Sequence, residues 1–354
     1  MFEAVSNAFS SPWWVAGIVA YGLIGIVVIR PTGGVWSYLM TAVGWPIELT
    51  QRLAGATGLP YLFLLPNMLV FGLFTFAPLF VSGGFAFTDG ASINFNEREF
   101  SGLENAQRLL RDINIDTGLS NPQADEFKGA VADTVVFSLV QVPVMILIAL
   151  ATALVLNRDI AGRAFWRSIF FYPVMLSPVV VGFLWALVLD RQGILSQTLM
   201  SWGVIDAPIQ WLQEGFWPMF WTVFVYTWAH LGFYMLILLA GLQAIPGDLY
   251  EAAEMDASSP LRTLWRLTIP LLMPTLLVVF VLALIKAVQA FEEILALQVN
   301  IDTVVEFIYN TGGIKGQVTP TGRGIAATAS LLIAGALILL SLLQMALSRR
   351  GAKL

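Results

Sequence analysis

Long runs of apolar residues set the first limit on what this chain can fold into. A helix needs about 20 apolar residues to cross the hydrocarbon core of a bilayer. Seven segments meet or approach this length, and the first of them is the shortest. We therefore predict an all-α integral membrane protein whose spans are Trp13–Ile29, Tyr61–Phe85, Val131–Leu156, Ile169–Leu189, Phe216–Leu242, Pro270–Leu297 and Gly324–Leu347.

The composition supports a membrane protein and excludes several other classes. Only 12% of the 354 residues are charged, about half of what a soluble domain carries. The chain has no cysteine and a single histidine, so disulfide frameworks and multi-histidine zinc sites are excluded. No basic patch for nucleic acid is present, and the net charge is −5. We therefore predict no metal site and no nucleic-acid partner.

Residues 1–58 are predicted to form a separate N-terminal region. The first residues, MFEAVSNAFSS, contain Glu3 but no Lys or Arg, so they lack the positive region of a signal peptide. Trp13–Ile29 is therefore interpreted as a retained membrane anchor. In Gly34–Gly58 polar and apolar residues are mixed, which favours an interfacial amphipathic helix.

The distribution of Lys and Arg predicts the orientation of the spans. Basic residues concentrate in the short loops on the cytoplasmic side of a membrane. Three segments that fall on one side of the alternating topology are basic, and we assign that side to the cytoplasm. The polar segment 86–130 is long, so its own basic residues weigh less in this rule. The cytoplasmic basic residues are then Arg158, Arg163, Arg167, Arg262, Arg266, Arg349, Arg350 and Lys353.

Segment 86–130 is predicted to be an extracytoplasmic insertion with some structure of its own. Within it, SGLENAQRLLRD has the pattern of a short amphipathic helix. Its apolar residues recur at helical spacing. We expect one face of this helix to carry Leu103, Ala106, Leu109 and Leu110.

Segment 245–270 places charged residues between two of the most apolar spans. Pro246 and Gly247 end the preceding span, and Asp248 followed by Glu251 has the spacing of a helix N-cap and capping box. Ser258 or Ser259 is predicted to cap a second short helix, with Pro260 in its first turn. A solvated cytoplasmic loop is the simplest alternative. Two capped helices with small alanines beside Leu264 and Trp265 instead favour a docking site for another protein.

The same residues resemble the EAA loop of ABC importer permeases. That family pattern is Glu-Ala-Ala, three residues, Gly, nine residues and then Ile-x-Leu-Pro. Leu267 and Ile269 stand at the family's Ile and Leu positions, and Ala257 replaces the family's Gly. A glycine there eases the turn between the two helices. The resemblance implies that contacts with an ATPase are made by Glu251, Ala252, Ala253, Asp256, Ala257, Arg262 and Pro270.

The resemblance extends over most of the chain from Tyr61 onward. The stretches YLFLLPNMLVFGLFTFAPLF, FSGLENAQRLLRD, GRAFWRSIFFYPVMLSPVVVGFLWALVLD and GRGIAATASLLI resemble the carbohydrate-uptake branch of type I ABC importers, of the maltose and glycerol-phosphate type. Two departures are Asp133, where an Asn usually precedes Thr134, and the short segment QVNIDTVVEF, which lacks the branch's usual Gly-Gly-Pro. Both concern the outer side of the protein.

This resemblance implies a fold and a set of partners. The fold is the type I importer permease, with six core helices in residues 61–347, one additional N-terminal helix, and a cytoplasmic tail at 348–354. The partners are a second permease, two cytoplasmic ATPase subunits and an extracytoplasmic solute-binding protein, in a bacterial inner membrane. The chain has no G-x-x-x-x-G-K-[ST] phosphate loop. ATP and magnesium are therefore expected on the ATPase subunits, with no cofactor and no enzymatic activity in this chain.

A polar stripe in the sixth predicted span is a candidate for the substrate path. Lys286, Gln289 and Glu293 lie at positions i, i+3 and i+7, on one face of a continuous helix. Ionisable residues within spans usually face the interior of the bundle. Such a stripe can hydrogen-bond sugar hydroxyls. An internal ion pair that fixes helix packing, or glutamates at the outer interface, are the alternatives.

Other candidates for the path carry aromatic or amide groups. His230 is mid-span, where a lone histidine is more often a satisfied interior group than a ligand. Trp185 can stack on a sugar ring, although packing is the commoner role. Trp228 and Gln141 complete the set.

Three rival functions stay open at this point. A secondary transporter explains the apolar spans and Lys286 but not the EAA loop. A membrane enzyme is disfavoured by the absence of cysteine and of a histidine cluster. An ABC permease for a glycerophosphodiester, a polyamine or an anion shares the EAA loop, so only the wider resemblance favours a sugar or oligosaccharide.

Overall fold

The computed structural model describes residues 59–90, 92–111, 121–313 and 321–351, with positions 44, 49, 51 and 55, and side chains as far as Met345. The chain divides into two compact units, Met1–Val81 and Ser82–Leu354. The predicted anchor Trp13–Ile29 and nearly all of the predicted interfacial helix lie outside the described residues. The first unit contains α4 (Leu59–Phe71), the π-helical turn η2 (Gly72–Phe76) and the start of α5 (Ala77–Ala86).

The described residues contain six helices that are long and apolar enough to cross a membrane. The expected all-α membrane fold is therefore confirmed, and the last six predicted spans each correspond to one of these helices. Their bounds are Pro60–Ala86, Pro122–Asn157, Pro178–Ser201, Trp217–Gln243, Pro260–Val288 and Gly322–Met345.

Three helices form the centre of the second unit. The long helix α7 (Pro122–Asn157) packs against both α11 (Trp217–Gln243) and α14 (Ile269–Val288). Their shared core is apolar and fully buried, with Phe137, Tyr234 and Leu238 exposing 1% or less of their surface. These helices are hydrophobic around most of their circumference, as expected for spans that contact other helices on one side and lipid on the other.

The predicted span Ile169–Leu189 is wrong as a single helix. The chain forms α8 (Arg163–Phe171), a 3-10 turn η4 (Tyr172–Met175) and then α9 (Pro178–Leu189). Ser177 is extended, with ψ of 135°, because the ring of a following proline disfavours the helical region. The candidate span here is therefore Pro178–Ser201, which contains α9 and the following helix α10 (Ile194–Ser201).

The predicted span Pro270–Leu297 is also wrong at both ends. The helix already begins at Pro260 and ends at Val288, and Glu292–Leu297 forms a separate helix, α15. This helix packs against α9 at Gly182, where an added Cβ would lie 2.5 Å from the Cβ of Ala296. Glycine is required at such a close approach, and it lets α15 lie directly against α9.

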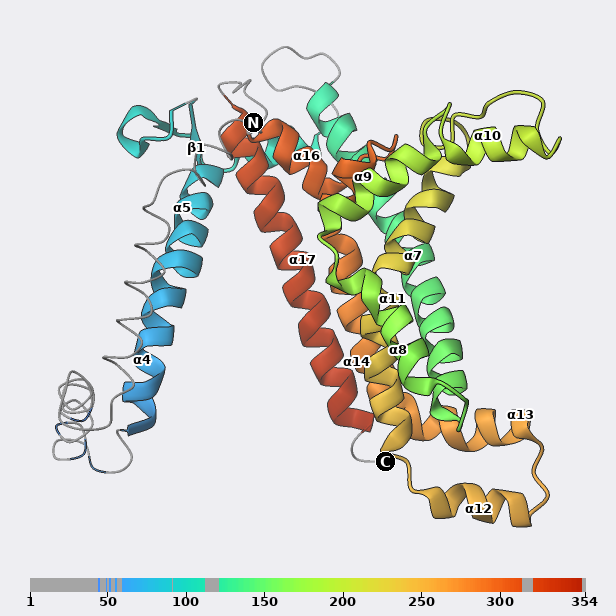
Figure 1. The fold of residues 1–354 in the computed structure, drawn as a ribbon. Coiled ribbons are helices and arrows are strands. Elements are labelled where there is room, and N and C mark those ends of the chain that lie inside the picture. Colours follow the sequence, from blue (N-terminus) through green and yellow to red (C-terminus); the bar gives the residue numbers. More distant parts are fainter. Residues whose placement is uncertain are drawn as a thin grey trace, which may run out of the picture. The chain divides into compact units, whose positions relative to one another are not determined.

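The end of the second unit opposite α12 carries short elements (Figure 1). The strands β1 (Thr88–Asp89) and β2 (Glu99–Phe100) are antiparallel, with Thr88 opposite Phe100. The other elements are the 3-10 turn η3 (Phe95–Glu97) and the helices α6 (Glu104–Leu110), α16 (Val304–Thr311) and the start of α17 (Gly322–Gly351).

Helix α6 exists as predicted, but only Leu109 of its predicted apolar face is fully buried. Its buried residues are Asn105 and Leu109, whereas Leu103 and Leu110 are more than half exposed. The apolar pattern missed this because a polar side chain, the amide of Asn105, is the group that docks the helix.

Candidate functional site

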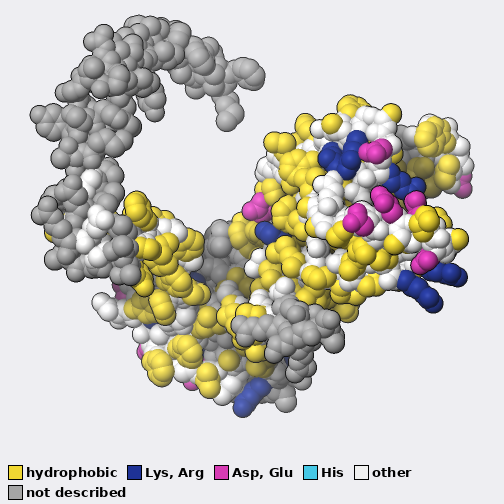
Figure 2. Space-filling view, turned by 90° about the horizontal axis from the view of Figure 1, so that it is seen from below, with side chains coloured by type: hydrophobic (Ala, Val, Ile, Leu, Met, Phe, Trp, Pro, Cys, Tyr) yellow, Lys and Arg dark blue, Asp and Glu magenta, His cyan; other side chains and the backbone are white. Residues whose placement is uncertain are grey.

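The charged segment forms an exposed helical bracket at one end of the second unit. Helix α12 (Gly247–Met255) is followed by α13 (Pro260–Thr263), and both lie beyond the end of the bundle in Figure 1. Seen from this end, acidic and basic side chains lie among hydrophobic ones (Figure 2). Met255 is 88% exposed and Trp265 is 63% exposed. Such apolar side chains on a charged surface are typical of a protein contact site.

A backbone motif, rather than side chains, fixes the end of α12. The amide of Ser258 donates to the carbonyl of Ala253, and the amide of Ala257 donates to that of Glu254. These two bonds form a Schellman motif, whose C′ residue must be left-handed. Ala257 takes this conformation with φ of 50°. The structure thus explains why the EAA pattern has glycine here, since an alanine in this region is strained by about 1–2 kcal/mol.

The start of α12 differs from the prediction. The residue before its first turn is Pro246, without a side-chain cap, so Asp248 lies inside the first turn and is not the N-cap. The predicted capping box with Glu251 is therefore wrong. Asp248 still stabilises the helix, because a negative charge is favourable near a helix N-terminus.

The second half of the bracket is continuous with a membrane span. The Oγ of Ser259 accepts from the amide of Arg262, which confirms one of the two predicted caps. The helix passes through a π-helical turn at Leu264–Thr268 into α14. Pro270 lies two residues after this turn and has no N–H for the usual bond, so the chain accommodates it with wider turns. Helices α13 and α14 are therefore parts of one continuous helix, Pro260–Val288.

Tyr250 of α12 contacts the helix that leads into the bundle. The hydroxyls of Tyr250 and Thr268 lie 3.2 Å apart. A cavity of about 680 Å³ lies beside this contact, lined among others by Arg158, Glu254 and Leu264. Glu251, Ala252 and Asp256 are exposed. The residues that the EAA pattern assigns to the ATPase are thus available on the surface of this chain.

The predicted polar stripe in α14 does not exist as one face. The helix ends at Val288, so Gln289 is its C-cap and Glu293 belongs to α15. Lys286 and Gln289 are exposed, whereas Glu293 is 6% exposed. No carboxylate in the described parts of the chain lies within ion-pair distance of Lys286. Among the described residues, Lys286 is therefore a cation without an ion-pair partner, and Glu293 is a buried carboxylate on a different helix.

The buried carboxylate has a partner on another helix. The Nε2 of His230 lies 3.4 Å from the Oε1 of Glu293, and its Nδ1 lies 3.0 Å from the carbonyl of Tyr226. The imidazole also stacks on the Tyr226 ring, with centroids 4.3 Å apart. The hydroxyl of Tyr226 donates to the carbonyl of Lys286. This network connects α11 with both α14 and α15 exactly where the span is interrupted.

The remaining candidates are held by neighbours. The Nε2 of Gln141 donates to Thr227 Oγ1 at 3.1 Å, both buried, which connects α7 to α11. Trp185 makes edge contacts with Phe224 and Trp228, with ring centroids 5.2 and 5.7 Å apart. The faces and edges of these tryptophans are thus used for packing, and each is only partly exposed.

Residues 145–353 match the family described as "Binding-protein-dependent transport system inner membrane component". The chain belongs to this family. The permease is similar to the lactose transport system permease protein LacF of Rhizobium radiobacter, at 31% identity over 66% of this chain and 74% of that protein. It is also similar to the trehalose/maltose transport system permease protein MalF of Thermococcus litoralis, at 34% identity over 68% and 76%.

A solved structure supports the same fold. The permease matches a chain of a bacterial ABC transporter involved in the import of the acidic polysaccharide alginate, with a TM-score of 0.67. The match covers 86% of this chain and 98% of that chain at 20% sequence identity. It confirms the predicted permease fold with its multi-pass helical core.

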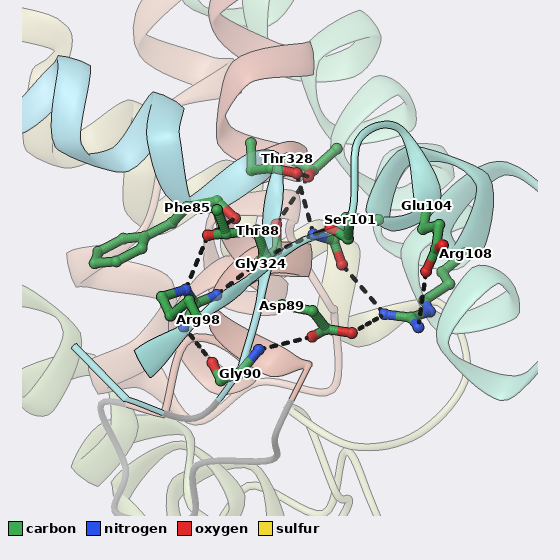
Figure 3. Close-up of polar contacts among 12 residues, drawn as sticks. Phe85, Thr88, Asp89, Gly90, Arg98, Ser101, Glu104, Arg108, Gly324 and Thr328 are labelled. Atoms are coloured by element: carbon green, nitrogen blue, oxygen red, sulfur yellow. Dashed lines mark hydrogen bonds and ion pairs between the residues drawn. The ribbon is translucent and has the colours of Figure 1, made fainter. Parts of the chain in front are cut away.

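A buried cluster that sequence reasoning missed lies at the end of the second unit opposite α12 (Figure 3). The sequence predicts this end to be extracytoplasmic, and we call it the outer end. Arg98 is 8% exposed. It donates to the hydroxyl and carbonyl of Thr88 at 2.9 and 3.0 Å and to the carbonyls of Gly90 and Ser92. It also lies over the ring of Phe85. Burial lowers the pKa of Arg98, and Asp89 partly offsets this. We call Arg98 with its partners the outer cluster.

Asn105 and α17 complete the outer cluster. The Nδ2 of Asn105, fully buried, donates to the carbonyls of Ala86 and Thr88, both at 3.1 Å. Gly324 of α17 lies against them, and a Cβ there would be 2.6 Å from Asn105 Nδ2. Thr328 also donates to the carbonyl of Ala86. The stretch GLENAQ predicts a helix around Asn105, but it does not show that this side chain contacts distant parts of the chain.

Asp133, which departs from the family's usual Asn, and the adjacent Thr134 bind the backbone where α16 begins. The amide of Asp302 donates to the carboxylate of Asp133, and the amide of Val304 donates to Thr134 Oγ1 at 2.9 Å. A carboxylate oxygen accepts this bond as an amide oxygen can. The replacement of the usual Asn is therefore compatible with the arrangement of the outer end.

Proposed function

We propose that this permease is one transmembrane subunit of an ATP-driven ABC importer for a sugar or oligosaccharide. The relatives with 31% and 34% identity are named for the transport of lactose and of trehalose and maltose. The partners in this proposal are a second permease, two cytoplasmic ATPase subunits that bind ATP and magnesium, and an extracytoplasmic solute-binding protein. The chain itself has no enzymatic role and resides in the inner membrane.

The exposed α12–α13 bracket is the observation that carries the proposal. In this proposal, α12 sits in a cleft of an ATPase subunit, with Glu251, Ala252 and Asp256 at the contact. Closure of the ATPases moves α12, and α13 passes the movement to α14 because the two are one helix. The bracket's fixed turn at Ala257 supports this role, since a rigid connection transmits force better than a flexible loop.

The substrate path in this proposal follows polar groups of α7, α11 and α14. Lys286 and Gln289 are exposed at the end of α14, and Gln141 and Thr227 form a polar pair inside the bundle. His230 and Glu293 hold the interrupted span in place. Trp185 and Trp228 pack the path's wall and do not stack on substrate.

Charge reversal on α12 tests the coupling role. Glu251→Lys is expected to abolish ATP-dependent uptake while the protein still inserts into the membrane, because it places a cation in the ATPase contact. Glu214→Lys, an exposed reversal at the opposite end, is the matched control and is expected to retain uptake. Normal uptake by Glu251→Lys would contradict the coupling role. Uptake that persists without ATP would favour a secondary transporter instead.

The free cation Lys286 favours one second candidate, an anionic solute. A further relative, 31% identical, is named the sn-glycerol-3-phosphate transport system permease protein UgpA of Agrobacterium fabrum. An unpaired ammonium group in a span attracts a negative ligand. Competition of neutral and anionic solutes for uptake separates the two candidates. If anionic solutes no longer inhibit uptake by Lys286→Gln while neutral solutes still do, the anionic solute is established as the substrate.

A further inference from the structure

Two arginines of α8 converge on one neutral oxygen. Arg163 and Arg167 are four residues apart, so they lie on the same face of the helix. Both direct an Nη2 atom at the side-chain oxygen of Gln243, at 2.8 and 3.1 Å, when the amide is oriented to accept these bonds. Gln243 is the last residue of α11. This site joins α8 to the point where the chain leaves the membrane for α12.

The two guanidinium groups lack sufficient acceptors. The Nε atoms of Arg163 and Arg167 are both buried without a hydrogen-bond partner. Arg163 has Asp159 at 3.8 Å, but that carboxylate is fully exposed and is screened by solvent. Throughout the described residues, no carboxylate lies within ion-pair distance of Arg167. A buried charged donor without a partner is costly, so this pair of like charges is complete only with an anion.

The surroundings of the two arginines are those of a membrane interface. The other side of α8 exposes Phe165, Trp166 and Ile169 by 64, 45 and 44%. Of these side chains, Trp166 is of the type that is enriched at the level of lipid headgroups. Gln243 is itself exposed, so the site opens outward rather than into the bundle. The helix therefore presents apolar groups to acyl chains and paired arginines to the headgroup region.

We propose that Arg163, Arg167 and Gln243 bind the phosphate group of an anionic phospholipid. A phosphate offers several oxygens, and guanidinium groups bind it through paired hydrogen bonds that reach the free Nε–H donors. Half a turn of the Gln243 amide replaces its oxygen by the NH₂ group, which donates to the same phosphate. Basic pockets between helices on the cytoplasmic side are suited to such headgroups. The bound lipid stabilises the end of α11 from which α12 begins.

The test compares lipid retention in variants that lose the same charge. The full-length protein is purified from membranes with the subunits that co-purify, and bound lipids are counted by native mass spectrometry. Wild type is expected to retain phosphatidylglycerol or cardiolipin in preference to phosphatidylcholine. Arg167→Gln is expected to reduce this retention on the order of tenfold, which corresponds to the loss of charged hydrogen bonds. Arg158→Gln, between α7 and α8, is the matched control and is expected to retain the lipid.

Further arms keep the proposal falsifiable. Arg167→Lys keeps the charge but loses the Nε–H donor, and intermediate retention is expected. If inorganic phosphate protects the wild type against thermal unfolding and added anionic lipid has no effect, the site binds a free anion. This result would overturn the proposal of a bound lipid. Equal retention by Arg167→Gln and Arg158→Gln would also overturn it. The proposal would also be overturned if Arg167→Gln kept its lipid but lost a co-purified subunit, because this would indicate a protein contact.

Discussion

The two ends of the second unit are held in different ways. At the outer end, buried polar side chains such as Arg98 and Asn105 bind the backbone of distant segments. At the opposite end, backbone bonds alone form the turn after α12, and its side chains remain exposed. Buried polar networks specify one arrangement only while every group is satisfied. The outer end is thus built to be fixed, and the bracket to hold its own shape while leaving its surface for a partner.

Removing Arg98 is expected to have the largest effect on this comparison. Arg98→Ala leaves the carbonyls of Gly90 and Ser92 without this donor, so we expect a loss of about 3 kcal/mol or more in the stability of the outer end. Limited proteolysis and thermal unfolding in detergent measure it. Arg111→Ala, which removes an exposed arginine nearby, is the control. Equal stability of the two variants would show that the outer cluster does not hold this end.

A methyl group at Gly324 tests the same cluster from α17. Gly324→Ala places a Cβ 2.6 Å from Asn105 Nδ2, and overpacking of this kind costs about 1–3 kcal/mol. Gly335→Ala is a matched control in the same helix, since nothing lies within 4 Å of its added Cβ. The midpoint temperature of thermal unfolding is expected to fall for Gly324→Ala and to stay level or rise for Gly335→Ala. The reverse order would contradict the close approach of α17.

The bracket is expected to respond in the opposite direction. Ala257→Gly removes the strain of a left-handed alanine, so the turn gains about 1 kcal/mol. Hydrogen exchange of the Ser258 amide is then expected to slow about fivefold. Ala253→Gly, inside α12, is the control and is expected to speed exchange, because glycine weakens a helix interior. Faster exchange in Ala257→Gly would show that the turn is not a Schellman motif in solution.

The smallest effect is expected inside the bundle, between the two ends. Gln141→Leu and Thr227→Val each remove one partner of a buried hydrogen bond. A double-mutant cycle is expected to give a coupling energy of about 0.6 kcal/mol, as is usual between membrane helices. Unfolding of the purified protein measures it. A coupling energy of zero would place this pair outside the interactions that connect the two ends.

The parts that could be predicted are those with local signals. The length of the apolar segments predicts six spans. Ser259 followed by Pro260 indicates the start of a helix from residue type alone. The stripe through Lys286, Gln289 and Glu293 failed because α14 ends at Val288 with no proline or glycine nearby. That end is set by packing of α15 on α9, which a periodic pattern does not contain.

The outer cluster was missed for a similar reason. Arg98 binds backbone carbonyls six, eight and ten residues away, and Asn105 binds one nineteen residues away. In the sequence both are ordinary polar residues of a loop and a short helix. Their burial depends on the path of the chain around them. Asp248 shows the converse, since a residue suited to capping is the second residue of the helix, two positions after the N-cap Pro246.

Cysteine cross-linking tests the central claim most directly, because the natural chain contains no cysteine. A single cysteine at exposed Ala252 in α12 is compared with one at exposed Glu214, at the opposite end. Each variant is expressed with its ATPase subunits and treated with a short bifunctional reagent in membranes. We expect the Ala252→Cys variant to cross-link to an ATPase subunit and the Glu214→Cys variant not to. Absence of the cross-link at position 252, or an equal one at 214, would contradict the assignment of α12 as the coupling helix.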